Sequence, residues 1–226
     1  MFNVVHLWGI FFGTVVALLP IINPLAAAPT FLTITEGDTD ERRQEQALKG
    51  CCYMVAILVS SLIGGTFIMN FFGISIPGLR IAGGIMMTGI GMNMLATHRP
   101  GSRGEEEERE AARRKVDISF SPLAMPMLSG PGSIAVTLGF TSLATQALDY
   151  VAIILGIVTV AFASYLVLRL AGRVVKFIGP VGMNAMTKIM GFLIMCIGVQ
   201  FVVNGVLGIA TDPELLRGIK AVLAGR

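Results

Sequence analysis

The stretch Ser129-Gly130-Pro131-Gly132-Ser133 interrupts a hydrophobic segment near its middle, and Asn23-Pro24 interrupts another in the same way. Proline lacks the N–H that an interior helical turn needs, and its ring clashes with the preceding turn. Both segments are long enough to cross a bilayer, where freed backbone groups are tolerated only if protein or a water-filled cavity satisfies them. The two breaks therefore predict two half-helix ends that meet at one polar cavity.

The composition is that of a helical membrane protein. Of the 226 residues, 54% are hydrophobic and 14% are charged, whereas about 25% of residues are charged in a soluble domain. The 27 glycines suit close packing of membrane helices. The three cysteines lie in apolar segments and offer no disulfide framework. The sequence has no cluster of basic and aromatic residues of the kind that would indicate nucleic-acid binding.

Six apolar segments predict an all-α polytopic fold with six transmembrane helices. We expect these spans at 4–35, 47–72, 79–95, 118–144, 148–170 and 183–209, with the first and fourth broken near the midplane. A charged linker over 96–117, with a surface helix from Glu105 to Lys115, separates a first three-helix repeat (1–95) from a second (118–210). Asp212 as N-cap and Pro213 at the first helical position predict an interfacial helix over 211–226.

The basic residues indicate the orientation in the membrane, because cytoplasmic loops carry an excess of Lys and Arg. With the N-terminus outside, the inside loops hold 13 of the 17 basic residues: Arg42, Arg43, Lys49, Arg99, Arg103, Arg109, Arg113, Arg114, Lys115, Arg169, Arg173, Lys176 and Lys188. Both termini are therefore predicted to lie outside.

The two halves align without a gap at a shift of 107 residues. Pro24 then falls on Pro131, Thr30 on Thr137, Gly84 on Gly191, and Ile90-Gly91 on Ile197-Gly198. Residue identity between the halves is near the chance level. The evidence for a repeat is that the two breaks and the six apolar segments stay in register at this shift. Each half contains three spans. Because this number is odd, the second half enters the membrane from the opposite side and is inverted relative to the first. Many secondary transporters are inverted repeats with midplane sites at broken helices.

The residues around both breaks resemble the signatures of the MarC family of prokaryotic inner-membrane proteins. The first is Ile22-Asn23-Pro24-Leu25 with Pro29-Thr30-Phe31-Leu32, and the second is 121–126 with 129–134. Where the first signature often continues with Gly-Asn, this chain has Ala26-Ala27. Some members of the family are small neutral amino-acid transporters, so the resemblance implies a carrier for substrates of the size of glycine or alanine.

The two breaks offer groups that suit both ends of an α-amino acid. Free N–H groups at the start of a half-helix, with Ser129 as its cap, suit the carboxylate. Carbonyls that end the preceding half-helix, and the Asn23 side chain, suit the ammonium. The candidate substrate-binding residues are Asn23, Pro24, Thr30, Ser129, Gly130, Pro131, Gly132, Ser133 and Thr137. Thr88, Asn93 and Gln200 could also line the cavity. The alternative is that the breaks are packing kinks in structural helices.

Residue types that are missing from the spans narrow the function. All 14 acidic residues lie in loops, at helix ends or in the tail, so no midplane carboxylate is available for a proton relay. Sodium held by carbonyls, amides and hydroxyls stays open as a coupling ion, as does uncoupled exchange. The sequence contains no HExxH motif, no GxSxG motif and no paired intramembrane aspartate, which are the patterns that would indicate an enzyme.

We therefore expect a secondary transporter of small neutral amino acids in the prokaryotic inner membrane, working by alternating access without a resident cofactor or metal. A channel, an exporter of another small solute and a purely structural protein are the alternatives. Whether the chain forms a homo-oligomer stays open.

Overall fold

The computed structural model describes residues 4–96, 117–141, 144 and 146–212, and this part of the chain is helical without a strand. The all-α prediction is confirmed for it. The expected surface helix in the linker and the expected C-terminal helix beyond Asp212 lie outside the described residues. The elements are α1 (Val4–Ile22), α2 (Pro24–Ile34), α3 (Asp40–Phe72), α4 (Ile76–Leu95), η1 (Ser119–Leu128), α6 (Pro131–Phe140), α7 (Ala147–Arg169) and α8 (Ala171–Ala210).

Four helices, α1, α3, α7 and α8, are long and apolar enough to cross a membrane. The pair η1 and α6, bent by 66°, makes a fifth if it is counted as one span. α4 has 20 residues, which suffices in length, but its glycines, Arg80 and Asn93 lower its hydropathy. The described chain is thus a polytopic membrane protein with four or five recognisable spans, where the sequence led us to expect six.

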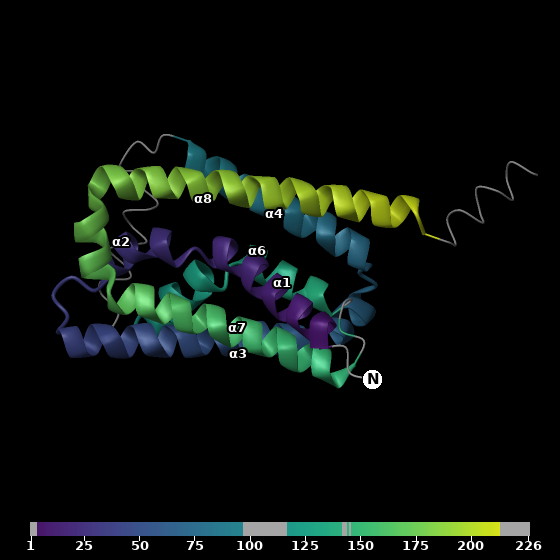
Figure 1. Cartoon of the computed structure of the whole chain (residues 1–226), viewed down its shortest axis with the longest axis horizontal. Coiled ribbons are helices and arrows are strands. Elements are labelled where there is room, and N and C mark those ends of the chain that lie inside the picture. Colours follow the sequence, from purple (N-terminus) through teal and green to yellow (C-terminus); the bar gives the residue numbers. More distant parts are fainter. Residues whose placement is uncertain (1–3, 97–116, 142–143, 145, 213–226) are drawn as a thin grey trace, which may run out of the picture.

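Two helices begin earlier than predicted. α3 begins at Asp40 rather than near residue 47, so most of the expected polar loop over 36–46 is helical. Thr39 caps it by accepting the Arg42 N–H (3.3 Å), and Asp40 and Glu41 lie in its first turn, where the helix dipole favours acidic residues. α8 begins at Ala171 and bends at Gly179, whose φ is 71°. Residues 171–178 therefore run across the end of the bundle before the long part of α8 (Figure 1).

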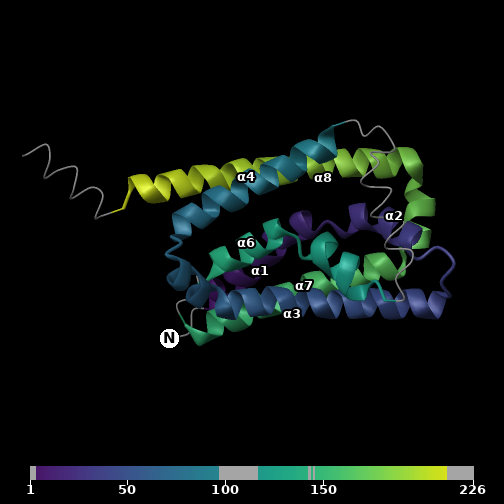
Figure 2. The same ribbon diagram turned by 180° about the vertical axis from the view of Figure 1, so that it is seen from behind.

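α4 and α8 lie side by side along one flank of the molecule (Figures 1 and 2). A β-carbon at Gly84 would be 2.5 Å from the Gly198 carbonyl oxygen, and one at Gly91 would be 2.5 Å from the Gly191 carbonyl oxygen. The close helix packing that the abundant glycines suggested is found there, whereas Gly89 has nothing within 4 Å. Positions that rise along α4 meet positions that fall along α8, so the two helices are antiparallel.

The core lies between α1, α2, α3 and α7, with α6 and η1 packed into it. Fully buried side chains include Leu18, Phe31, Met54, Leu58 and Ile157. Large apolar side chains also cover the outer faces, as in Trp8, Phe12, Phe67, Phe162 and Val199. An apolar exterior of this extent is unfavourable in water and suits contact with lipid.

Candidate substrate site at two helix breaks

The first break is a single residue. α1 ends at Ile22, Asn23 adopts the left-handed conformation (φ 45°, ψ 63°), and Pro24 opens α2. Among the described residues Asn23 alone combines a side chain with positive φ, a conformation that asparagine tolerates better than most residues. Its Oδ1 accepts the Ala26 N–H at 3.3 Å and so caps α2. The break thus falls where the sequence predicted it, at Asn23-Pro24.

The second break is longer. η1 has non-helical backbone angles at Ser121 and Met125 and ends at Leu128, and Pro131 opens α6. The N-cap of α6 is Gly130, and no side chain caps the helix. The expected capping role of Ser129 is therefore wrong, because the extended backbone of Gly130 (φ −69°, ψ 169°) separates Ser129 from the first turn.

The two hydroxyls inside α6 bond to their own helix. Ser133 Oγ donates to the Gly130 carbonyl and Thr137 Oγ1 donates to the Ser133 carbonyl, each at 2.8 Å. Both residues are buried. Their hydroxyl protons are thus engaged, and each oxygen can still accept a hydrogen bond.

The breaks lie next to each other. A β-carbon at Gly132, in the first turn of α6, would be 3.4 Å from Ile21 Cγ2 in the last turn of α1 and 3.1 Å from Met87 Cγ in α4. α6 also runs beside α1 in both views (Figures 1 and 2). Helix N-termini carry partial positive charge and unpaired N–H groups, so the start of α6 contributes donors to this region. At the start of α2, the Ala26 and Ala27 N–H groups donate to Asn23.

Each break buries a polar atom without a partner. In the described part of the chain, Asn23 Nδ2 and Ser129 Oγ are the two buried side-chain N or O atoms that form no hydrogen bond. Asn23 is 6% exposed and Ser129 is 0% exposed. The unpaired atom is the amide nitrogen, a donor, which suits a carboxylate. The ammonium that we expected Asn23 to bind would have to share Oδ1 with the Ala26 N–H. Unpaired buried polar groups are costly, and a ligand or water usually satisfies them.

A cavity of about 350 Å³ flanks the second break. It lies between α4 and the η1–α6 segment, and Met86, Met125, Ser129, Pro131 and Leu138 are among its lining residues. This volume is at the lower end of the range of about 300–1,000 Å³ that is usual for small-molecule sites. The walls are mainly apolar, so polar recognition falls to Ser129 and the backbone.

The comparisons with known proteins agree with the motifs at both breaks. Residues 8–210 match the family described as MarC family integral membrane protein. The chain belongs to the MarC family. It is 38% identical over 205 residues to inner membrane protein MarC of Citrobacter koseri, covering 86% of this chain and 92% of that protein. The corresponding proteins of Escherichia coli (strain K12) and Shigella flexneri are 37% identical with the same coverage. No solved structure matches.

These relatives are inner membrane proteins, and together with the apolar helices they support a multi-pass protein of the inner membrane. The family resemblance drawn from the two signatures is confirmed.

The other candidate positions of this MarC-family protein are spread apart. Thr30 is half-buried on α2, and Thr88 is half-buried and donates to the Gly84 carbonyl at 2.8 Å. Asn93 and Gln200 are exposed on α4 and α8, and Gln200 Nε2 donates to Asn204 Oδ1 at 2.9 Å. The last two amides therefore face outward and do not line the cavity.

Acidic groups lie away from the breaks. Among the described residues, Asp149 is the one buried charged side chain, at 2% exposed. It sits in the first turn of α7, accepts the Gln146 N–H at 3.0 Å and lies 3.5 Å from His6 Nε2. Within the described part of the chain, no three His, Cys, Asp or Glu side chains are grouped so that they could hold a metal ion.

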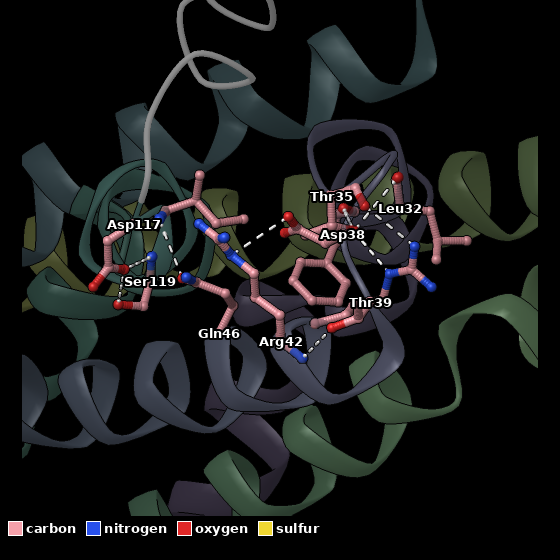
Figure 3. A network of polar contacts seen from close by, with 11 residues as sticks. Leu32, Thr35, Asp38, Thr39, Arg42, Gln46, Asp117 and Ser119 are labelled. Atoms are coloured by element: carbon pink, nitrogen blue, oxygen red, sulfur yellow. Dashed lines mark hydrogen bonds and ion pairs between the residues drawn. The ribbon is translucent and has the colours of Figure 1, made fainter.

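A polar network ties both broken helices to α3 (Figure 3). It lies at the start of α3, at the opposite end of the bundle from the start of α7, which holds Asp149 (Figure 1). Arg43 Nε donates to Thr35 Oγ1 just after α2 (3.0 Å), and Gln46 Oε1 accepts the Ile118 N–H just before η1 (3.1 Å). Sequence reasoning missed Gln46, because its partner is 72 residues away. The network fixes one end of each broken helix, while the other end leads into the break.

Proposed function

We propose that this protein is a secondary transporter of small neutral amino acids, of the glycine and alanine class, with its substrate site at the two helix breaks. The observation that carries the proposal is the pair of unpaired buried polar atoms, Asn23 Nδ2 and Ser129 Oγ, one at each of two adjacent breaks.

The groups at the breaks suit a zwitterion. Asn23 Nδ2, the Ser129 hydroxyl and the first N–H groups of α6 at Gly132 and Ser133 can donate to the carboxylate. The last carbonyls of α1 can accept from the ammonium. Gly132 packs close to Ile21 and Met87, and this close packing beside the site disfavours a substrate with a large side chain.

We infer that the two halves form an inverted repeat, with residues 1–95 and 118–210 as its units and six spans in all. Pro24 and Pro131, aligned at the 107-residue shift, each open a half-helix. The shift makes α1 equivalent to η1, α2 to α6, α3 to α7, and α4 to α8. The packing agrees with this correspondence, because α1 packs on α7 as η1 packs on α3, and α2 packs on α8 as α6 packs on α4.

Two glycine contacts between α4 and α8 also support the inverted repeat, because the repeat relates one contact to the other. The 107-residue shift turns the contact of Gly84 with Gly198 into that of Gly191 with Gly91, and both are close. Antiparallel α4 and α8 are what an inverted repeat requires.

The orientation that we propose has both termini outside. It can be checked by single cysteines at Thr39 and Ser75, which lie in connections at opposite ends of α3, in a protein whose native cysteines are replaced by serine. A membrane-impermeant maleimide added to intact cells should label Ser75→Cys and not Thr39→Cys. The reverse labelling would refute the orientation.

The coupling that we propose does not use a buried acid at the site, since the nearest candidates among the described residues lie at helix ends. Sodium or uncoupled exchange is expected, with proton coupling disfavoured, and we expect neither a resident cofactor nor enzymatic activity.

Uptake into proteoliposomes tests the function. The purified protein is reconstituted and given labelled glycine, alanine and serine, with sodium and proton gradients imposed separately. We expect saturable uptake that accelerates when unlabelled substrate is present on the opposite side. Large unsaturated flux without exchange would indicate a channel, and no flux of any of the three would refute the assigned substrate class.

A further inference from the structure

A second cavity, remote from the breaks, lies where α7 passes into α8. Its volume is about 620 Å³, and it is bounded by the start of α3, the last turn of α7 and the first turns of α8. Four cationic side chains line it, namely Arg43, Arg169, Arg173 and Lys176, against one carboxylate, Asp40.

The carboxylate does not balance these charges. Asp40 pairs with Arg43 Nη1 at 3.2 Å, and Arg43 also donates to the side chain and the carbonyl of Thr35. Arg43 is thus a fixed wall of the cavity. No described carboxylate lies within 4.0 Å of Arg169, Arg173 or Lys176, so three positive charges face the cavity uncompensated by the described part of the chain.

Local structure holds these three charges together. The Arg169 guanidinium lies 6.0 Å from the Tyr165 ring centroid, within the range of a cation–π contact. Arg173 and Lys176 are three residues apart on one helix, which places them on the same face. The bend at Gly179 turns residues 171–178 across the end of the bundle (Figure 1).

The surroundings of the cavity are those of a membrane interface. It lies at the ends of three apolar spans, and Leu166 and Leu170 form part of its wall. Phe177, next to Lys176 in the chain, is 93% exposed. A short helical segment that carries basic residues and an exposed aromatic side chain beside them is typical of the headgroup region. A ligand here meets cations at one end and lipid at the other.

We propose that this cavity binds the phosphate headgroup of an anionic phospholipid. Basic pockets between membrane helices on the cytoplasmic side recognise such headgroups, and the gain is about fivefold in affinity for each Lys or Arg near the surface. A free phosphate offers the same anion. The apolar wall and the exposed Phe177 favour the lipid. The inference does not depend on the transport function.

A neighbouring cavity of about 470 Å³ at the same end of the bundle provides the contrast. Its cations are matched, because Arg42 pairs with Asp38 at 3.4 Å and Lys49 pairs with Glu45 at 2.7 Å. Glu41 and Asp117 line it as well. Two exposed basic residues line this cavity, Arg42 and Lys49, as many as the pair Arg173 and Lys176 in the first cavity. Here the carboxylates balance their charge.

The test measures binding of short-chain phosphatidylglycerol to the full chain in detergent by native mass spectrometry. The variant Arg173→Gln/Lys176→Gln should bind about 30-fold more weakly than the wild type. The matched control Arg42→Gln/Lys49→Gln should bind within about twofold of the wild type. Arg173→Lys keeps the charge and should retain most of the affinity.

Two further probes separate the sources of the anion. Short-chain phosphatidylcholine should bind clearly more weakly than phosphatidylglycerol, and glycerol phosphate without acyl chains should compete poorly. Equal binding of the two lipids would overturn the recognition of charge. Competition by glycerol phosphate at the lipid's own affinity would identify a soluble phosphate site instead. An equal loss in the control variant would show a general effect of surface charge. If the double variant does not fold, Lys176→Gln alone should show about a fivefold loss, and an unchanged affinity would refute the site.

Discussion

Met87 of α4 packs directly over Gly132 of α6, so that a β-carbon at position 132 would lie 3.1 Å from Met87 Cγ. On its other side the same β-carbon would be 3.4 Å from Ile21 Cγ2, at the end of α1. The glycine lies within the regular helix α6, so it is needed for space and not for an unusual backbone conformation. One position thus joins both broken helices to α4.

Replacing Gly132 by leucine should abolish amino-acid uptake while the protein still inserts, because the side chain would clash with Ile21 and Met87 and push the two breaks apart. Gly132→Ala should retain part of the uptake, since the unbranched Met87 side chain need move by only a few tenths of an ångström at Cγ. Uptake by proteoliposomes, normalised to the amount reconstituted, measures both. Gly89→Leu is the control, as nothing lies within 4 Å of that glycine. Wild-type uptake by Gly132→Leu would exclude the site.

Substitutions of Asn23 should separate its cap from its free donor. Asn23→Asp keeps an acceptor for the Ala26 N–H but replaces the buried donor with a negative charge, which repels a carboxylate. We expect a folded protein without measurable uptake. Asn23→Gly keeps the left-handed conformation at low cost and should raise the apparent Michaelis constant for glycine about tenfold, the loss of one hydrogen bond to a charged group.

The matched control for this series is Asn23→Ala, which loses the side chain and also strains the backbone by about 1–2 kcal/mol. It should weaken substrate affinity and also lower the melting temperature below that of Asn23→Gly. An unchanged affinity in both variants would remove Asn23 from the substrate site.

The sequence was sufficient to locate the breaks, because proline and glycine act on their own turn of helix. It could not reveal which atoms at the breaks stay unpaired. The donor character of Asn23 depends on its left-handed backbone, which turns Oδ1 towards Ala26. The capping role assigned to Ser129 failed for a similar reason, as the extended Gly130 intervenes.

The early start of α3 had a signal that hydropathy hides. A charged first turn looks like a loop on a hydropathy scale, yet Thr39 followed by Asp40 and Glu41 is an N-cap signature. The link from Gln46 to Ile118 had no such local signal, since it depends on how distant segments meet in space.

Stability at acid pH should depend on Asp117, two residues before η1. Hydrogen bonds from the Ser119 hydroxyl and N–H, in that order, hold the pKa of this carboxyl below its ordinary value of 3.8. A carboxyl whose pKa is lower in the folded than in the unfolded protein stabilises the fold at pH values above its unfolded pKa. This contribution is lost as the pH falls through its folded pKa. Asp117→Ala should therefore lower the melting temperature at pH 7, and its difference from the wild type should shrink below about pH 4. Ser119→Ala should behave alike, and a difference independent of pH would contradict the assignment.

Alanine at either of the two tight glycines of α4 should destabilise the α4–α8 pair by similar amounts. At Gly84 and at Gly91 the added β-carbon would be 2.5 Å from a backbone carbonyl of α8, and backbone, unlike a side-chain end, can yield only if the helices separate. Overpacking of this kind costs about 1–3 kcal/mol, so each variant should show a lower melting temperature in detergent, with Gly89→Ala unchanged. If the halves are related by a twofold axis, Gly191→Ala should match Gly84→Ala, and Gly198→Ala should match Gly91→Ala. A large effect confined to one member of each aligned pair would argue against the repeat while leaving the close packing intact.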